Sequence, residues 1–208
     1  MRSRLLLTVV SVIVFAGCSD APPKTAAKAP EAPPEPVSGS TAFFRMYTAA
    51  RAWATDLQPL RMNSVNLPEV KKVPGKAAAW QATFVSTQRS AAKTYSYSVI
   101  ESTSAGIHKG VFAGNEEGWR GPPPAAKPFM IQALKIDSDA AYEIALKKGK
   151  KAAEYMKANP DKNVMFLLEQ NNKFPNLTWR VIWGESVGTS NYSIFVDASS
   201  GEYLETMR

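Results

Sequence analysis

The sequence predicts an α+β fold of two tandem units, each with one helix packed on an antiparallel sheet of about three to four strands. Two stretches of helical apolar spacing, each followed by three segments expected to be strands, lead to this prediction. The third observation is a glycine- and proline-rich segment at 121–124, which has the composition of a linker. The chain has 208 residues, so it can hold two small units.

The first unit is expected over residues 41–121. Ser40 and Thr41 are suitable N-cap residues for its helix, and Pro59 is expected to end it. The apolar residues at helical spacing are Phe43, Tyr47, Ala50, Ala54 and Leu57. The strands follow a short segment at 60–67 and are expected at 80–84, at 95–99 and from Gly106 towards Val111 and Phe112.

The second unit is expected over residues 136–208, after a linker and a leading strand at 122–135. Asp137, Ser138 and Asp139 form a capping cluster for its helix, Gly149 is expected to weaken or bend it, and Pro160 ends it. The apolar residues at helical spacing are Ala141, Ala145, Ala152, Tyr155 and Met156. Strands are expected at 164–169, 178–183 and 192–196, followed by a turn at 199–201 into 202–205, as a hairpin or as a strand with a tail.

The first 17 residues have the layout of a secretory signal. Arg2 and Arg4 precede an apolar run from Leu5 to Ala16, which at roughly 12 residues is shorter than the about 20 that cross a bilayer. The run ends at Cys18, and this ending resembles the lipobox of bacterial lipoproteins. The resemblance implies cleavage before Cys18 and a lipid on its thiol. The alternative is an ordinary secretory peptide that is cleaved elsewhere.

Residues 18–40 are expected to form a tether. Apart from Cys18 they are almost entirely proline, alanine, lysine, glutamate, serine and glycine, a composition that favours extended structure over a packed core. The body is therefore expected in the periplasm or the extracellular space, held by lipid to a bacterial membrane. Ser19 favours the outer membrane if the host is Gram-negative, since the residue after the lipidated cysteine directs sorting in enteric bacteria.

The composition makes several kinds of chemistry improbable. Cys18 is the single cysteine and His108 the single histidine, so disulfides, thiolate metal sites and Ser-His-Asp constellations are not expected. His108 is expected in an exposed loop. We find no phosphate loop, metal box or nucleophile motif, and we expect no cofactor and no enzymatic activity.

The chain carries a formal net charge of +7, and its densest basic cluster is Lys147, Lys148, Lys150 and Lys151. Such a cluster is usually a solvated helix face. The alternative is a patch that contacts anionic lipid headgroups or wall polyanions. Nucleic acid is not expected as a partner, because the chain is predicted to be exported.

Residues 136–205 resemble the PepSY family, a small exported module of helix and sheet. The resemblance depends on the segment 136–145, which opens the helix, and on the closing segment 192–202. Within the second segment, Asp197 is expected to bond the backbone of the following turn, and Gly201 to adopt the left-handed conformation that reverses the chain. The resemblance implies a cystatin-like helix-on-sheet fold and a non-catalytic interaction or inhibitory role.

Two groups of aromatic residues are candidates for binding. Trp119 and Arg120 lie in an acidic, proline-rich loop and could form a recognition surface, but Trp119 could instead fill the seam between the units. The tryptophans at 80, 179 and 183 are expected to pack in the core, and only exposure would make them a sugar-stacking platform.

These observations favour a membrane-tethered, exported lipoprotein that acts as a non-catalytic binding or regulatory module, with inhibition of a peptidase as one form of regulation. Its expected partner is a protein or peptide of the cell envelope. The alternative is a structural envelope protein that binds polyanionic wall or lipid material through the lysine cluster. A hydrolase would need carboxylates that converge from distant positions, such as Glu169 and Asp197.

Overall fold

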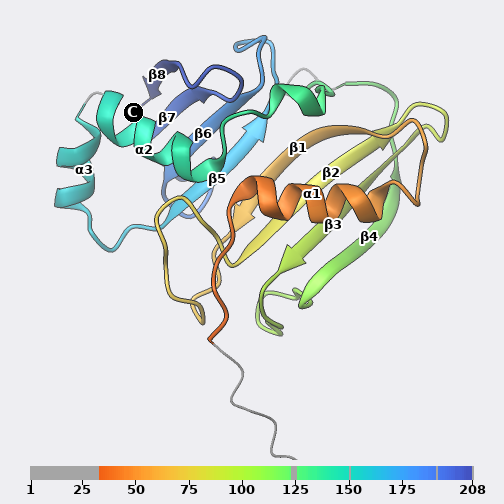
Figure 1. Cartoon of the computed structure of the whole chain (residues 1–208), viewed down its shortest axis with the longest axis horizontal. Coiled ribbons are helices and arrows are strands. Elements are labelled where there is room, and N and C mark those ends of the chain that lie inside the picture. Colours follow the sequence, from red (N-terminus) through yellow and green to blue (C-terminus); the bar gives the residue numbers. More distant parts are fainter. Residues whose placement is uncertain (1–32, 123–125, 150, 191, 208) are drawn as a thin grey trace, which may run out of the picture. The chain divides into compact units, whose positions relative to one another are not determined.

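Eight antiparallel strands form one continuous sheet in the order β4-β3-β2-β1-β5-β6-β7-β8 (Figure 1). The computed structural model describes residues 33–122, 126–149, 151–190 and 192–207. Its elements are α1 (Gly39–Ala50), β1 (Gln58–Val65), β2 (Ala79–Ser86), β3 (Ala91–Ser98), β4 (Gly110–Gly118), a 3-10 turn η1 (Ile131–Ala133), α2 (Ser138–Lys148), α3 (Ala152–Ala158), β5 (Val164–Glu169), β6 (Thr178–Trp183), β7 (Tyr192–Asp197) and β8 (Tyr203–Met207).

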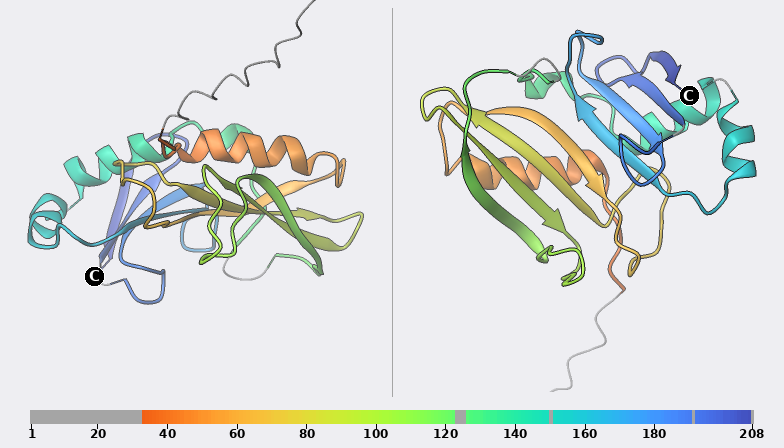
Figure 2. Two further views of the ribbon diagram at one scale, coloured as in Figure 1. Left: turned by 90° about the horizontal axis from the view of Figure 1, so that it is seen from below. Right: turned by 180° about the vertical axis from the view of Figure 1, so that it is seen from behind.

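The helices α1 and α2 cover the same face of the sheet (Figure 2). Helix α1 contacts β2, β3 and β4, whereas α2 contacts β6, β7 and β8. Alternate residues of the strands point towards these helices and form the main core, in which Trp80, Trp179 and Trp183 are fully buried. The expectation that these three tryptophans pack in the core is therefore confirmed, and they offer no exposed stacking platform.

The prediction of two tandem units, each with its own helix and sheet, is wrong. Strand β1 pairs with β5 through Arg61–Glu169, Met62–Leu168 and Asn63–Leu167, which joins the strands of both halves into a single sheet. The core is also shared, because the ring of Trp80 lies 6.0 Å from that of Phe166 and 6.3 Å from that of Trp179.

The joining strand β1 was not predicted as a strand, because its proline was interpreted as a helix stop. Pro59 lies inside β1, at a register shift in the pairing with β2, where a missing backbone N–H is tolerated. Helix α1 ends much earlier, at Ala50. The segment at 60–67 thus contains most of a central strand, and this strand is what makes the two halves one sheet.

The predicted second helix is broken at Gly149, between α2 and α3. A side-chain carbon at this position would lie 2.1 Å from Ile194 Cδ1 and 2.4 Å from the Ala145 carbonyl oxygen. Only glycine therefore permits this close approach of the helix to β7. Lys151 follows with a left-handed backbone (φ 60°) and starts the short helix α3.

The N-termini of α1 and α2 are linked through the predicted capping cluster. Ser138 Oγ accepts a hydrogen bond from the Gly39 amide at 2.8 Å and donates one to the Gly75 carbonyl at 2.6 Å. Asp137 Oδ1 accepts a hydrogen bond from the Ser40 amide at 2.8 Å. Helix α1 begins at Gly39, before the expected cap at 40–41, and the Ser40 amide is satisfied by the start of the other helix.

The turn that follows β7 has the predicted chemistry. Asp197 Oδ1 accepts hydrogen bonds from the amides of Ser199 and Ser200, at 2.7 and 2.9 Å. Gly201 has a φ of +76°, in the left-handed region. The turn leads into β8, which pairs with β7 as a hairpin.

The predicted signal, its Cys18 and residues 18–32 of the tether lie outside the described residues. The described part begins with residues 33–38, and Val37 exchanges two backbone hydrogen bonds with Ala77, each 3.0 Å long. The indole nitrogen of Trp80 donates to the Val37 carbonyl at 3.1 Å. No helix in the described part of the chain is long and apolar enough to span a membrane.

Candidate functional site

A cavity of about 510 Å³ lies where β1 ends, β5 begins and β6 ends. Neighbouring strands of the sheet run antiparallel, so these three strand ends lie side by side. Beside them, the Gly184 amide donates a hydrogen bond to the Asn163 carbonyl at 2.9 Å. The cavity is closed by the 66–78 loop, which connects β1 to β2, and by residues of α2, α3 and the segment after α3. It therefore combines segments from both halves of the chain.

The inner wall of the cavity is apolar and aromatic. Tyr142 of α2, Phe166 of β5 and Trp183 of β6 are all buried and line it. Their rings contact one another, with centroids 6.4 Å apart for Tyr142 and Phe166 and 6.3 Å apart for Tyr142 and Trp183. Met156 of α3 adds a flexible side chain, and its sulfur accepts a hydrogen bond from the Tyr142 hydroxyl at 3.0 Å.

The 66–78 loop is held at several points, so the cavity is preformed. Glu69 accepts hydrogen bonds from the hydroxyls of Ser102 at 3.0 Å and Ser104 at 3.3 Å. The pKa of Glu69 is lowered, mainly by a bond from its own backbone amide and also by that from Ser102. At the other end of the loop, the Gly75 carbonyl accepts from Ser138, and Ala77 pairs with Val37.

Three residues that line the cavity each have one buried polar atom without a hydrogen-bond partner. The atoms are Asn66 Nδ2, Trp183 Nε1 and Asn163 Oδ1, and a fourth such atom in the described part of the chain, Trp119 Nε1, lies elsewhere. Buried polar groups in folded proteins are almost always paired, with the protein itself or with bound water. These three atoms have almost no accessible surface, so they lie behind the surface of the cavity and not on it.

The mouth of the cavity is basic. Lys71, Lys72 and Lys76 are exposed and Lys162 is partly exposed, while Glu185 is the one acid among the lining residues. Glu185 Oε1 is occupied by a hydrogen bond of 2.7 Å from Asn163 Nδ2. Lys162 contacts the Tyr155 hydroxyl at 3.2 Å, and Lys72 reaches the Asp161 carbonyl at 3.5 Å. The mouth therefore attracts anions.

Glu185 is the one acid among the described lining residues, and it is exposed and accepts a hydrogen bond from Asn163. Glu169 and Asp197, the acids considered for a hydrolase, do not line it. Within the described ranges, no group of three or more His, Cys, Asp or Glu residues is placed to hold a metal ion.

The residues proposed from the sequence as a binding surface lie outside this cavity. Trp119 is half-buried and packs beside Leu60, Val85 and Ala126, so it fills a small cluster of its own rather than a seam between two units. Arg120, next to it, is exposed.

The predicted lysine cluster lies at the end of α2, and its described members Lys147, Lys148 and Lys151 are exposed. Lys147 Nζ lies 3.9 Å from Glu143 Oε2 on the same helix. Lys150 falls outside the described residues. None of the three described lysines lines the cavity.

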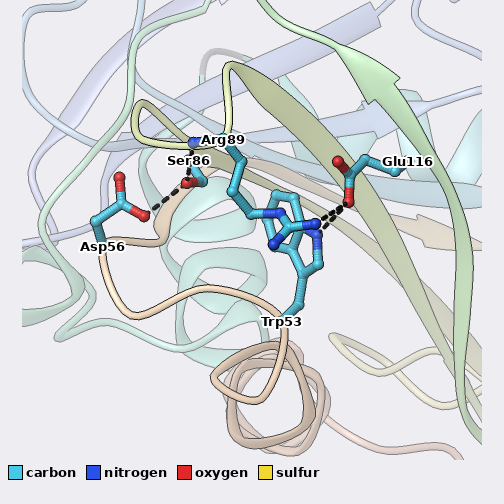
Figure 3. A network of polar contacts seen from close by, with 5 residues as sticks. All are labelled: Trp53, Asp56, Ser86, Arg89 and Glu116. Atoms are coloured by element: carbon cyan, nitrogen blue, oxygen red, sulfur yellow. Dashed lines mark hydrogen bonds and ion pairs between the residues drawn. The ribbon is translucent and has the colours of Figure 1, made fainter.

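A second polar network, at the end of α1, has its acids satisfied within the protein (Figure 3). Glu116 accepts hydrogen bonds from Trp53 Nε1 at 2.6 Å and from Arg89 at 3.1 Å, and Asp56 accepts one from Ser86 at 2.6 Å. The bond from Trp53 lowers the pKa of Glu116. This network ties the loop after α1 to the β2–β3 hairpin and to β4, and we assign it a structural role.

Sequence analysis missed the cavity, because its lining comes from positions separated by more than one hundred residues. The signal that could have drawn attention is the 66–76 stretch, in which three lysines and two prolines occur within a few residues of an asparagine.

His108, expected in an exposed loop, is exposed, with Nδ1 2.7 Å from Glu101.

The comparisons with known proteins concern the fold. A solved chain from Clostridium difficile 630, described provisionally as a lipoprotein, has a TM-score of 0.51 and 12% sequence identity, and the match covers 79% of this chain and 91% of that chain. At this identity the likeness shows a shared fold. No protein-family model and no curated protein matches the chain, so the resemblance to the PepSY family is not confirmed.

Proposed function

We propose that the protein is a membrane-tethered lipoprotein that binds a small organic molecule in the cavity at the ends of β1, β5 and β6, without transforming it. The observation that carries this proposal is the cavity of about 510 Å³ itself, whose lining combines aromatic side chains with four lysines.

The size and the lining of the cavity favour a ligand site over a packing defect. A cavity volume of about 510 Å³ lies within the range of about 300–1,000 Å³ that is usual for small-molecule sites. Such sites are lined mainly by hydrophobic and aromatic side chains, and Tyr142, Phe166 and Trp183 belong to the lining here.

The lipid attachment rests on the leader and its Cys18. The match to a chain described as a lipoprotein supports this part of the proposal at the level of the fold. A lipid-held body with a ligand cavity is suited to capture or sense a solute close to the membrane. We propose a binding protein of this kind, with regulation of an envelope partner as a consequence of ligand occupancy.

The test is to find out whether the cavity holds an organic ligand. Native mass spectrometry of the full-length protein purified from its membrane should show an adduct that is lost on denaturation, and the released compound can then be identified. A thermal-shift screen of envelope metabolites should raise the melting temperature for compounds of the same class, since a ligand at 100 times its Kd adds about 2.7 kcal/mol. A protein without adduct, stabilised by no compound, would refute the proposal.

A further inference from the structure

Strand β4 ends the sheet on the side of the first half of the chain, and its outer edge is an interaction surface (Figure 1). We infer that its partner is a second copy of this chain. In the resulting dimer, β4 of one copy pairs antiparallel with β4 of the other, and the two eight-stranded sheets become one. This surface is separate from the proposed ligand cavity, which no residue of β4 lines.

The two edges of the sheet differ in how open they are. Strand β8 has five residues, all partly buried, and Lys173 Nζ lies 2.7 Å from Glu205 in it. Strand β4 has nine residues, and all except Gly110 and Gly114 are exposed. An exposed edge offers unpaired backbone N–H and C=O groups to another strand, and natural edges are often protected by proline or lysine. The sequence of β4 contains neither residue, so this edge is open to pairing.

Two neighbouring apolar side chains of β4 are exposed. Val111 is 39% exposed and Phe112 is 48% exposed. Because successive side chains of a strand point to opposite faces, they lie on different faces of the sheet. Val111 lies beside Tyr97 on the face that the helices cover, and Phe112 lies beside Ser96 on the other face. A partner on one face would cover one of the two, whereas a strand added at the edge would cover both.

The side-chain pattern of β4 fits pairing with itself. The register shift between β3 and β4 falls after Ala113, so residues 110–113 alternate regularly. An antiparallel pair centred on Phe112 places the two Phe112 rings opposite each other on one face, and Val111 opposite Ala113 on the other. Side chains opposed in this way have Cβ atoms about 4.5–5.5 Å apart, so the two rings would touch. A slip of one residue would oppose Phe112 and Val111, which point to different faces.

The charges of β4 favour the antiparallel direction. Lys109 precedes the strand, and Glu116 and Glu117 lie at its end. Glu116 is already paired with Arg89 at 3.1 Å, whereas Glu117 forms no ion pair with another described residue. Parallel pairing would set the two copies of Glu117 side by side, which is destabilising. Antiparallel pairing separates them and brings each acidic end towards Lys109 of the other copy.

Pairing of β4 with β4 also gives a closed assembly. The same surface is used by both copies, so the dimer has a twofold axis and does not grow into a fibre, as pairing of β4 with β8 would. This axis is perpendicular to the sheet, so the helices of both copies lie on one side. The described chain enters α1 on that side (Figure 2). Two copies held to one membrane by the proposed tether could therefore pair, and sharing a membrane raises their effective concentration.

The first experiment tests the centre of the pairing by cross-linking. Full-length protein carrying Phe112→Cys would be oxidised mildly in the membranes of the bacterium that produces it. We expect a covalent dimer as the main product, because opposed Cβ atoms at about 4.5 Å can be bridged by a disulfide. Met130→Cys is the matched control, since Met130 is 64% exposed but lies outside the strands, and the natural protein gives the background from Cys18. Equal cross-linking of the two variants would overturn the inference.

The second experiment measures the strength of the dimer. Sedimentation velocity of the full-length protein in detergent micelles over a dilution series would give its dissociation constant. Phe112→Lys should weaken the dimer about tenfold or more, because it removes the apolar contact and opposes two like charges. Met130→Lys introduces the same charge at the other exposed position and should leave the constant within about twofold. Circular dichroism would show that both variants are folded, and equal effects of the two would contradict pairing at Phe112.

The third experiment tests the direction of the strands. Glu117→Lys should weaken the dimer about threefold, because each new lysine comes close to Lys109 of the other copy. Glu154→Lys makes the same change on the exposed surface of α3 and should have no effect. A dimer strengthened by Glu117→Lys would contradict the antiparallel arrangement.

Two further outcomes would overturn the inference as a whole. Cross-linking of Phe112→Cys to a protein of another mass, and not to itself, would show that this edge binds a strand of a different protein. A natural protein that stays monomeric in micelles at every concentration, with no cross-linked dimer from Phe112→Cys in membranes, would show that the edge is left unpaired.

Discussion

Single residues of the 66–78 loop set the shape of the cavity, and Gly75 is the clearest example. It has a φ of +73°, and a side-chain carbon added to it would lie 2.2 Å from the Cα atom of Asp139. The loop can approach the start of α2 this closely only with glycine at this position.

We therefore expect Gly75→Ala to lower the free energy of unfolding by about 2–4 kcal/mol, from left-handed backbone strain and overpacking together. Urea denaturation followed by circular dichroism would measure the change. The control is Gly106→Ala, which has a similar φ of +63° and open space around it, so it should cost only about 1–2 kcal/mol. Equal costs for the two variants would show that the contact with α2 does not matter.

Asp197 is a buried carboxylate whose pKa is set by its turn. Burial raises the pKa, but hydrogen bonds from Asn176 and from the amides of Ser200 and Ser199 outweigh it, so the pKa lies below its ordinary value of 3.8. A carboxyl group with a depressed pKa in the folded state stabilises the protein above its unfolded pKa. That stabilisation is lost as the pH falls through the folded pKa.

We expect Asp197→Asn to lower the free energy of unfolding at pH 7 by about 1.5–3 kcal/mol, the range for hydrogen bonds to a charged group. The difference between variant and natural protein should shrink as the pH falls below about 4, because the carboxyl group is then protonated in the unfolded state before it is protonated in the folded state. Urea midpoints at pH 7 and pH 3 would measure it, with the exposed Asp161→Asn as control. A difference that stays constant with pH would contradict the assignment.

At the level of elements, Ser138 connects three segments that are far apart in the sequence. Its buried hydroxyl bonds the Gly39 amide at the start of α1 and the Gly75 carbonyl in the 66–78 loop. Replacing it by alanine leaves both of these backbone groups without their partner.

We expect Ser138→Ala to cost about 2–4 kcal/mol, because each abandoned buried group costs about 1–3 kcal/mol. Relative to the natural protein, the variant should also show a larger increase in the rate of hydrogen exchange at the start of α1 than in the central strands. Ser186→Ala, which removes a partly exposed hydroxyl that bonds Thr189 in its own loop, is the control and should cost about 1 kcal/mol or less. Unaltered exchange at α1 would contradict the role of Ser138 in joining these elements.

Most strands could be predicted from local pattern, since β2 and β3 lie where apolar and polar residues alternate, and β5, β6 and β7 are short, mainly apolar runs. Strand β1 could not, because Pro59 is a strong breaker in either type of element, and only its position at a bulge makes it tolerable. The break at Gly149 was anticipated, whereas the early end of α1 at Ala50 was not. Local sequence carries the turn and strand signals, but which strands pair across the two halves is decided by long-range packing.

The candidate site could not be predicted from the local sequence for the same reason. Asn66, Asn163 and Trp183 become neighbours only because β1 pairs with β5 and β5 with β6. Nothing in the sequence near Trp183 distinguishes its unpaired indole nitrogen from that of Trp179, which donates to the Ile136 carbonyl at 2.8 Å. Trp119 and Lys147 are expected at a binding surface because of the residues next to them in the sequence. Such local composition does not show which distant residues come together in the fold.

At the level of the whole molecule, the continuous sheet and shared core predict cooperative unfolding. The described residues from 33 onwards fall into one compact unit, and the core cluster contains residues of both helices and of both halves of the sheet. Differential scanning calorimetry should therefore show one transition, with a calorimetric enthalpy equal to the van't Hoff enthalpy. Far-UV and near-UV circular dichroism should report the same midpoint. Two separate transitions would indicate that the halves fold independently.

The attachment of residues 33–38 beside the cavity has a mechanical consequence. Pro36 lines the cavity, and Val37 is held by its two backbone hydrogen bonds to Ala77 and by the bond from the Trp80 indole. This pair is an isolated bridge, outside the ladders of the sheet. If the protein is tethered as proposed, a pull on residue 33 from the N-terminal side would load this bridge before any strand of the sheet. Such tension would separate Pro36 and Val37 from the 66–78 loop while the core stayed intact.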